Sequence, residues 1–167
     1  MMEEKKLFFE VMSHDEALEI AYNWKYEGEL SFYNMTSDED DLKTFLDDNA
    51  RGQNTFSVRT QREEDMIAYF YYYLVDNYTA EIILAISPKH LHKGYGKEII
   101  MYAEEALSER KAVRKIAVAV AAFNKSCIDF YEGLGFINVG KFKNQTNGGT
   151  HTFLKMEKTI GTTIPFS

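Results

Sequence analysis

Two glycines and a group of basic side chains follow a strongly apolar segment near the middle of the sequence. Residues 82–86 are all apolar, Ser87-Pro88 ends the run, and a helix is predicted from Gly94. Glycine lets a ligand approach the backbone closely, and the unpaired amides of a helix start attract anions. Positive charge comes from five neighbours, Lys89, His90, His92, Lys93 and Lys97. The pattern indicates a pyrophosphate site, and a tight turn with solvated lysines fits the same residues equally well.

Spacing excludes two common phosphate-binding motifs from this segment. The sequence has no Gly-x-x-x-x-Gly-Lys-Ser/Thr loop, and Ile99 stands where a dinucleotide fingerprint has its third glycine. A pyrophosphate bound here therefore belongs to another kind of ligand.

A second pattern follows about thirty residues later. It reads Asn124-x-x-Cys127-x-x-x-Tyr131-x-x-x-Gly135-Phe136, and the first pattern reads Leu91-x-x-Gly94-x-Gly96. In this order and at this separation, the two patterns resemble the motifs of the GNAT family of acyl-CoA-dependent N-acyltransferases. That family has Gln or Arg where Leu91 stands and a small residue such as Ala where Cys127 stands. The close matches cover residues 82–136, about a third of the chain.

The resemblance implies that acetyl-CoA is the cosubstrate. Its expected contacts are the end of the apolar strand, the loop that follows and one asparagine: Leu84, Ala85, Ile86, His92, Lys93, Gly94, Tyr95, Gly96, Lys97 and Asn124. Tyr131 is expected to protonate the departing thiolate, since a thiol pKa of about 8.5 and a phenol pKa of about 10 are close enough for the transfer. The glutamate that some relatives carry on the fifth strand falls on Ala119. Glu81 is therefore the candidate base, with an exposed strand-end carboxylate as the alternative interpretation.

The acceptor side is expected on the first two helices and the loop between them, as in the family. The candidate substrate contacts are Trp24, Tyr26, Tyr33 and Tyr71, beside Glu27 and Glu29. Aromatic faces and carboxylates suit an ammonium group. Ordinary core packing is the competing interpretation, and we favour it for Trp24 and for Phe32.

The implied function is N-acetyl transfer by direct attack of an amine on the thioester in a ternary complex. The acceptor would be a small-molecule primary amine or a peptide N-terminus. Two alternatives are a non-catalytic acyl-CoA-binding or regulatory module on the same fold and a generic nucleotide-binding domain. A homodimer is expected by analogy only. No histidine pairs with Cys127 as a nucleophile would require, and the four histidines lack metal-ligand spacing, so no metal is expected.

Composition narrows the class of protein. The chain has 167 residues, 45% of them hydrophobic, and a net charge of −7, which disfavours nucleic acid as a partner. It has one cysteine, and no apolar run approaches the roughly 20 residues of a membrane span. Because the apolar stretch near the N-terminus is too short for a signal peptide, a cytoplasmic location without membrane association is expected.

Hydrophobic periodicity predicts a mixed α/β (α+β) fold of the GNAT type. It would be a single domain over 1–167, with 159–167 as a tail, and a mostly antiparallel sheet of about seven strands flanked by about four helices. Strands are predicted over 7–11, 55–60, 66–75, 80–86, 115–120, 136–142 and 150–156. Helices are predicted after the capping box Ser13-x-x-Glu16, from Ser37, and over 94–110 and 124–134, and the segment 26–35 is predicted to be an aromatic loop.

Overall fold

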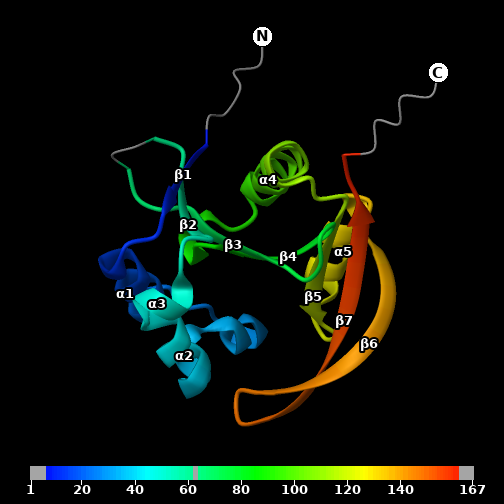
Figure 1. Cartoon of the computed structure of the whole chain (residues 1–167). Coiled ribbons are helices and arrows are strands. Elements are labelled where there is room, and N and C mark those ends of the chain that lie inside the picture. The colour runs from blue at the N-terminus through cyan, green and yellow to red at the C-terminus, as the bar shows by residue number, and fades with distance from the viewer. Residues whose placement is uncertain (1–6, 62–63, 162–167) are drawn as a thin grey trace, which may run out of the picture. The chain divides into compact units, whose positions relative to one another are not determined.

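A computed structural model describes residues 7–61 and 64–161 of the chain. Seven strands form a sheet in the order β1-β2-β3-β4-β5-β7-β6, with β4 and β5 parallel and the pairs β1–β2, β2–β3, β5–β7 and β6–β7 antiparallel (Figure 1). This confirms the predicted mixed α/β class and the seven strands. The elements are β1 Phe8–Val11, α1 His14–Asn23, η1 Gly28–Tyr33, η2 Met35–Ser37, α2 Glu39–Leu46, α3 Asp48–Arg51, β2 Thr55–Arg59, β3 Ala68–Leu74, β4 Thr79–Ile86, η3 Pro88–His90, α4 Tyr95–Lys111, β5 Lys115–Ala121, α5 Lys125–Gly133, β6 Ile137–Thr146 and β7 Gly149–Thr159.

The contacts group these elements into two compact units. The N-terminal unit comprises the chain as far as residue 71 together with 84–95, and the C-terminal unit comprises 72–83 together with the chain from residue 96 onward. Strands β3 and β4 contribute residues to both units.

The N-terminal unit places α1, α2 and α3 close together (Figure 1, blue to cyan). The predicted capping box is confirmed at α1, where the Ser13 hydroxyl accepts from the Glu16 amide at 3.2 Å and the Glu16 carboxylate accepts from the Ser13 amide at 2.9 Å. The apolar face of α1 packs into a buried cluster with Trp24 and Met66, against which Phe45 of α2 also packs. Burial of this face, at about 25 cal/mol per Å² of apolar surface, holds the helices to β3.

The C-terminal unit is built around α4 and the strands β5, β6 and β7. Ile99 and Ile100 of α4 and Ile116 of β5 are fully buried in its core. The hairpin β6–β7 turns at Asn147-Gly148, where both residues have positive φ, and it is longer than the predicted strands, so that it runs as a curved ribbon (Figure 1, orange to red).

Several boundaries differ from the sequence-based expectation for local reasons. The helix predicted from Ser37 begins at Glu39, because the Asp38 side chain caps it by accepting from the Asp41 amide. The segment predicted to be an aromatic loop winds into the 3₁₀ turns η1 and η2. A fifth α-helix, the four-residue α3, was not predicted, and Gly52 ends it at φ +62.

Strand β5 has one exposed residue, Ala119, between the buried Val118 and Val120. The predicted tail and the loop after β2 fall partly outside the described residues, at 162–167 and 62–63. Among the helices of 7–61 and 64–161, none is long and apolar enough to cross a bilayer.

Candidate functional site

The connection between β4 and α4 presents backbone rather than side chains at its centre. After η3 the chain passes through His92 at φ +62 and Gly94 at φ +83 before α4 begins at Tyr95. A side chain at φ +83 is strained, and a Cβ at Gly94 would meet no atom within 4 Å, so backbone conformation and not crowding requires the glycine. The connection therefore turns at Gly94, immediately before α4 begins, and the space beside the Gly94 Cα is open.

Three lysines supply the positive charge of this connection. Lys89, Lys93 and Lys97 are all exposed. Burial lowers the pKa of His90, and the charge of Lys93 lowers it further, although Asp65 opposes the shift. His90 is therefore neutral near pH 7. It does not contribute to the positive charge that the sequence predicted for this segment.

A cleft of about 330 Å³ lies beside the connection within the N-terminal unit. Its walls come from the end of β2, the loop before β3, η3 and the first residue of α4: Thr60, Glu64, Asp65, Ile67, His90 and Tyr95. The His90 and Tyr95 rings are 6.1 Å apart. Because two carboxylates border this cleft, it is a poor site for phosphates.

Gly96, the second glycine of the motif, is required for packing, whereas Gly94 is required for its backbone conformation. A Cβ built at Gly96 would lie 3.0 Å from Cζ of Phe130, so α4 and α5 approach closely at this point. The motif predicted that Gly96 contacts acetyl-CoA. No sequence motif specified Phe130. The helical spacing of Phe130 in α5 is the only signal that could have drawn attention to it.

Asn124 caps α5. Its Oδ1 accepts from the Cys127 amide at 3.1 Å, which satisfies one of the orphan donors of that helix. Burial raises the pKa of the Cys127 thiol to about 11, so the side chain is a protonated packing residue at neutral pH.

Tyr131 is buried, with 6% of its surface exposed. Its ring makes edge contacts with Phe130 and Phe136 at centroid distances of 5.0 and 5.1 Å. The ring is therefore held in place by Phe130 of α5 and by Phe136, the residue before β6.

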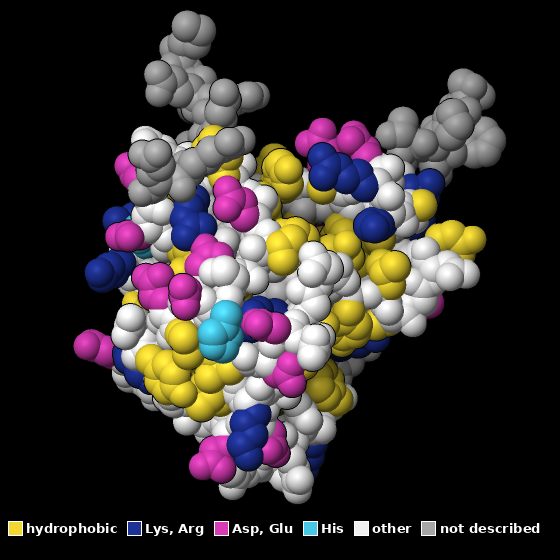
Figure 2. All heavy atoms as spheres, turned by 60° about the vertical axis from the view of Figure 1, so that its left-hand side comes forward, with side chains coloured by type: hydrophobic (Ala, Val, Ile, Leu, Met, Phe, Trp, Pro, Cys, Tyr) yellow, Lys and Arg dark blue, Asp and Glu magenta, His cyan; other side chains and the backbone are white. Residues whose placement is uncertain are grey.

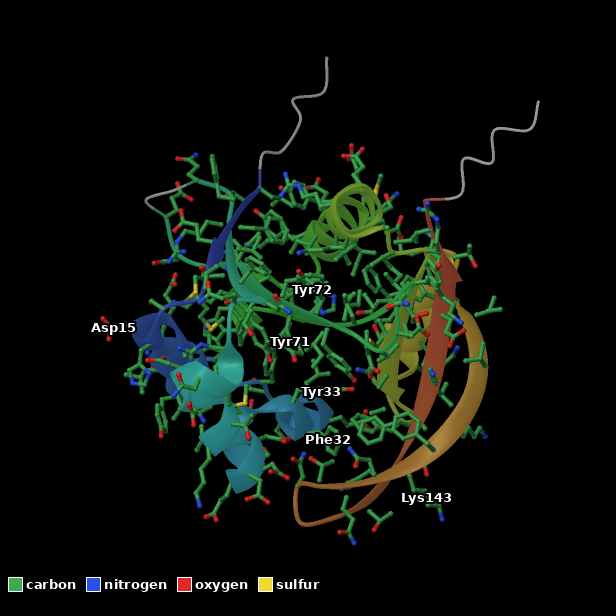
Figure 3. The ribbon with its side chains drawn as sticks, in the orientation of Figure 1. Asp15, Phe32, Tyr33, Tyr71, Tyr72 and Lys143 are labelled. Atoms are coloured by element: carbon green, nitrogen blue, oxygen red, sulfur yellow. The ribbon has the colours of Figure 1, made fainter. Side chains whose placement is uncertain are left out.

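The aromatic candidates of the acceptor side fall into distinct environments. Trp24 is 7% exposed and packs beside Tyr69 in the core, as the packing interpretation predicts. Phe32 and Tyr33 form an edge-to-face pair on η1 at 5.3 Å, and Tyr71 projects from β3 (Figure 3). Tyr33 is the most exposed of the candidate substrate contacts, with 40% of its surface accessible.

Tyr26 contacts the donor strand. Its hydroxyl donates a hydrogen bond to the carbonyl of Ile86, the last residue of β4. Leu84, Ala85 and Ile86 are half-buried, and within the N-terminal unit the structure brings this predicted substrate residue to a predicted cofactor residue. Glu81, the candidate base, is half-buried five residues earlier in the strand, opposite Ala117.

Negative charge is concentrated in residues 14–51. This segment holds 11 carboxylates and three Lys or Arg side chains, a net charge of −8 against −7 for the entire chain, so the remaining residues sum to +1. Asp and Glu side chains are spread over the face that Figure 2 presents. Such a field attracts cations to the helices that precede β2.

Comparison with protein families gives one match. The model of the acetyltransferase (GNAT) family matches residues 15–136, well over half of the chain. No curated protein matches the sequence closely enough to serve as a relative.

Solved structures share the fold at low sequence identity. A spermidine/spermine N-acetyltransferase from Vibrio cholerae has a TM-score of 0.67 at 19% identity, covering 92% of this chain and 95% of that chain. A GNAT-family acetyltransferase from Bacillus anthracis has a TM-score of 0.72 at 15% identity, with coverage of 93% and 95%. A ribosomal-protein-S5-alanine acetyltransferase from Vibrio fischeri has a TM-score of 0.66 at 14% identity and covers 98% of both chains.

Proposed function

Because the chain belongs to the acetyltransferase (GNAT) family, we propose that it transfers an acetyl group from acetyl-CoA to a primary amine that carries further positive charge. The observation that carries the acceptor class is the net charge of −8 on residues 14–51. One structural neighbour is a spermidine/spermine N-acetyltransferase, and polyamines are acceptors of this kind. A peptide N-terminus among basic residues is the other acceptor of this kind. Turnover with such a peptide and not with polyamines would identify it as the acceptor.

The donor site that we propose is the β4–α4 connection. Acetyl-CoA carries a diphosphate, and the connection combines the first amides of α4, a glycine at φ +83 and three exposed lysines. The proposed contacts are Leu84, Ala85 and Ile86 for the pantetheine arm and the residues from His92 to Lys97 for the phosphates. Leu91 contributes no polar side chain, so the backbone and the lysines carry this role.

The proposed reaction needs three proton transfers. The neutral amine attacks the thioester carbonyl, the carbon–sulfur bond breaks as the amide forms, and the thiolate takes a proton from the Tyr131 hydroxyl. The attacking nitrogen loses one proton as the amide forms, and that proton returns through water to the Tyr131 phenolate. The ammonium form of the acceptor, with a pKa of about 10.4, must first lose a proton. Glu81 or a water chain is the proposed acceptor of that proton.

Release of free thiol from acetyl-CoA over a panel of amines tests the activity. We expect turnover with polyamines or basic peptides. Monoamines that carry no further positive charge should turn over more slowly, because the salt-sensitive attraction is weaker. Absence of thiol release with every amine, despite acetyl-CoA binding, would identify a non-catalytic acyl-CoA-binding module. Selective thermal stabilisation by CoA over ATP and NAD excludes a generic nucleotide-binding domain.

Tyr131→Phe tests the acid. We expect kcat to fall by roughly 10²-fold or more while the affinity for acetyl-CoA is unchanged, because the ring contacts remain and the proton donor is lost. Tyr102→Phe, at an exposed position of α4, is the matched control and should behave like the parent protein. Equal turnover in the Tyr131→Phe variant would remove Tyr131 from the mechanism.

The cellular setting is also part of the proposal. The single cysteine is compatible with a reducing compartment such as the cytoplasm. A homodimer is proposed by analogy, and light scattering of the purified chain would measure the assembly state.

A further inference from the structure

Both polar groups of the Ile86–Ser87 peptide are held by protein. The Ile86 carbonyl accepts from the Tyr26 hydroxyl, and the Ser87 amide donates to the Ile67 carbonyl at 2.8 Å. The Ile67 amide in turn donates to the carbonyl of Val58 on β2 at 2.9 Å. The last peptide of β4 is therefore bonded on one side to neighbouring backbone and on the other to one side chain sixty residues away.

The backbone of Tyr26 is itself clamped. Its amide donates to Oδ1 of Asn34 at 2.7 Å, and Nδ2 of Asn34 donates to the Tyr26 carbonyl at 3.4 Å. Asn34 lies between η1 and η2, where its carbonyl accepts from the Ser37 amide at 2.9 Å. The acceptor-side segment 26–37 is thus folded onto itself in a form that directs the phenol to β4.

The phenol remains a hydrogen-bond donor at all working pH values. Burial raises the pKa of Tyr26, and the nearby Tyr69 hydroxyl raises it further. Tyr69 is itself shifted to a pKa of about 12 by burial and by the charge of Asp41. Neither phenol loses its proton near neutrality, so the hydroxyl of Tyr26 donates whenever the fold is intact.

We propose that Tyr26 is a positioning residue, which fixes the orientation of the Ile86–Ser87 peptide and joins the acceptor-side segment 26–37 to the strand that binds the acyl donor. This inference rests on the proposed function in one respect, the pairing of acetyl-CoA with residues 84–86. Its structural half, the fixation of the peptide, stands independently of any ligand.

The physical reason is the position of this peptide at the end of a strand. Beyond Ile86 the chain leaves the sheet for η3, so this peptide continues into the sheet on its N-terminal side only. Without the hydroxyl, a half-buried carbonyl would lack its partner and would rotate or recruit water. A donor aligned on this peptide would then be displaced from its reactive position, and small displacements reduce rates strongly.

Tyr26→Phe is the direct test, with Tyr22→Phe as the matched control on the exposed face of α1. Hydrogen exchange at the Ser87 amide of the free protein measures how firmly the Ile86–Ser87 peptide is held. Steady-state kinetics with acetyl-CoA measure whether this peptide contributes to the reaction. In Tyr26→Phe we expect exchange at Ser87 to accelerate about tenfold and kcat/KM for acetyl-CoA to fall about tenfold, the effect of one lost hydrogen bond. Tyr22→Phe should match the parent in both measurements.

A second variant guards against a general loss of structure. Asn34→Ala leaves the phenol in place and releases its backbone, so we expect changes of the same direction but of smaller size. Unchanged exchange at Ser87 in the Tyr26→Phe variant overturns the inference. Accelerated exchange with unchanged kinetics overturns the proposed role of this peptide in binding acetyl-CoA. If the parent protein fails to bind acetyl-CoA, the proposed function is overturned, and accelerated exchange in Tyr26→Phe still supports the fixation of the Ile86–Ser87 peptide by Tyr26.

Discussion

The start of α4 differs from the starts of the other four α-helices in the described part of the chain. Ser13 caps α1, Asp38 caps α2, Asp47 caps α3 and Asn124 caps α5, each through a side-chain oxygen that accepts a backbone amide. Gly94 precedes α4 and has no side chain to offer. Four of the described α-helices are thus capped by the side chain of the residue before them, whereas the residue before the longest described helix has no side chain.

This difference is the one expected if the start of α4 binds an anion, as we propose for acetyl-CoA. A side-chain cap is worth about 1 kcal/mol, so its omission from a 17-residue helix is a cost that bound phosphate would offset. This contrast can be tested in two ways. Side chains can be added at the glycines near the start of α4, and capping side chains can be removed from the starts of α1 and α5.

The largest effect is expected from Gly94→Val. A branched side chain at φ +83 forces the turn into another conformation, and the loss of aligned amides should weaken acetyl-CoA binding by roughly a hundredfold. Isothermal titration with acetyl-CoA measures the affinity. Gly133→Ala, at the end of α5 with open space around it, is the control and should bind normally. Full affinity in Gly94→Val would refute the proposed phosphate site.

Gly96→Ala should act through packing and not through the ligand. The new Cβ would lie 3.0 Å from the Phe130 ring, and overpacking of this kind costs about 1–3 kcal/mol. Chemical denaturation measures the loss of unfolding free energy. Phe130→Leu in the same chain should restore part of it by making room, and an equal loss in the double variant would show that crowding is not the cause.

Asn124 separates capping from cofactor contact. Asn124→Ala removes the bond to the Cys127 amide and should lower the unfolding free energy by about 1 kcal/mol. Asn124→Ser keeps a capping oxygen, so its stability should stay near that of the parent. If Asn124→Ser also retains full acetyl-CoA affinity, the predicted contact between the Asn124 side chain and acetyl-CoA is wrong.

The smallest effect concerns the capping box of α1. Burial acts to raise the pKa of Glu16, but hydrogen bonds from the Ser13 amide and the Arg59 side chain lower it on balance. A carboxyl whose pKa is lowered on folding stabilises the protein above its unfolded value, near 4.5, and this contribution is lost as the pH falls through the folded value. The parent protein should therefore exceed Glu16→Gln in unfolding free energy at pH 7, and this advantage should shrink as the pH falls from 7 to below 4.5. A constant difference across this range would contradict the assignment.

Some expectations could be derived from neighbouring residues alone. The capping box at Ser13 and the helix after Gly94 depend on interactions within a few positions, and each is found as predicted. The helix predicted from Ser37 fails by two residues because Asp38 competes successfully as the cap. Local rules predict that a helix begins in such a region more reliably than they predict its first residue.

Other features depend on partners that no local pattern names. Arg51 is buried because Asp48 and the Phe45 carbonyl surround it, and the need for Gly96 arises from Phe130, thirty-four positions later. His90 looks like a cation in the sequence, and its surroundings make it neutral.

The amino-acid sequence alone determines the order of strands and helices, the two glycine-containing motifs and the glycine that precedes α4, because steric limits, periodicity and capping operate over short stretches of chain. The bond from Tyr26 to Ile86, the neutral state of His90 and the close approach of α4 and α5 exist only after folding, because burial and long-range contacts depend on which distant segments the completed chain places together.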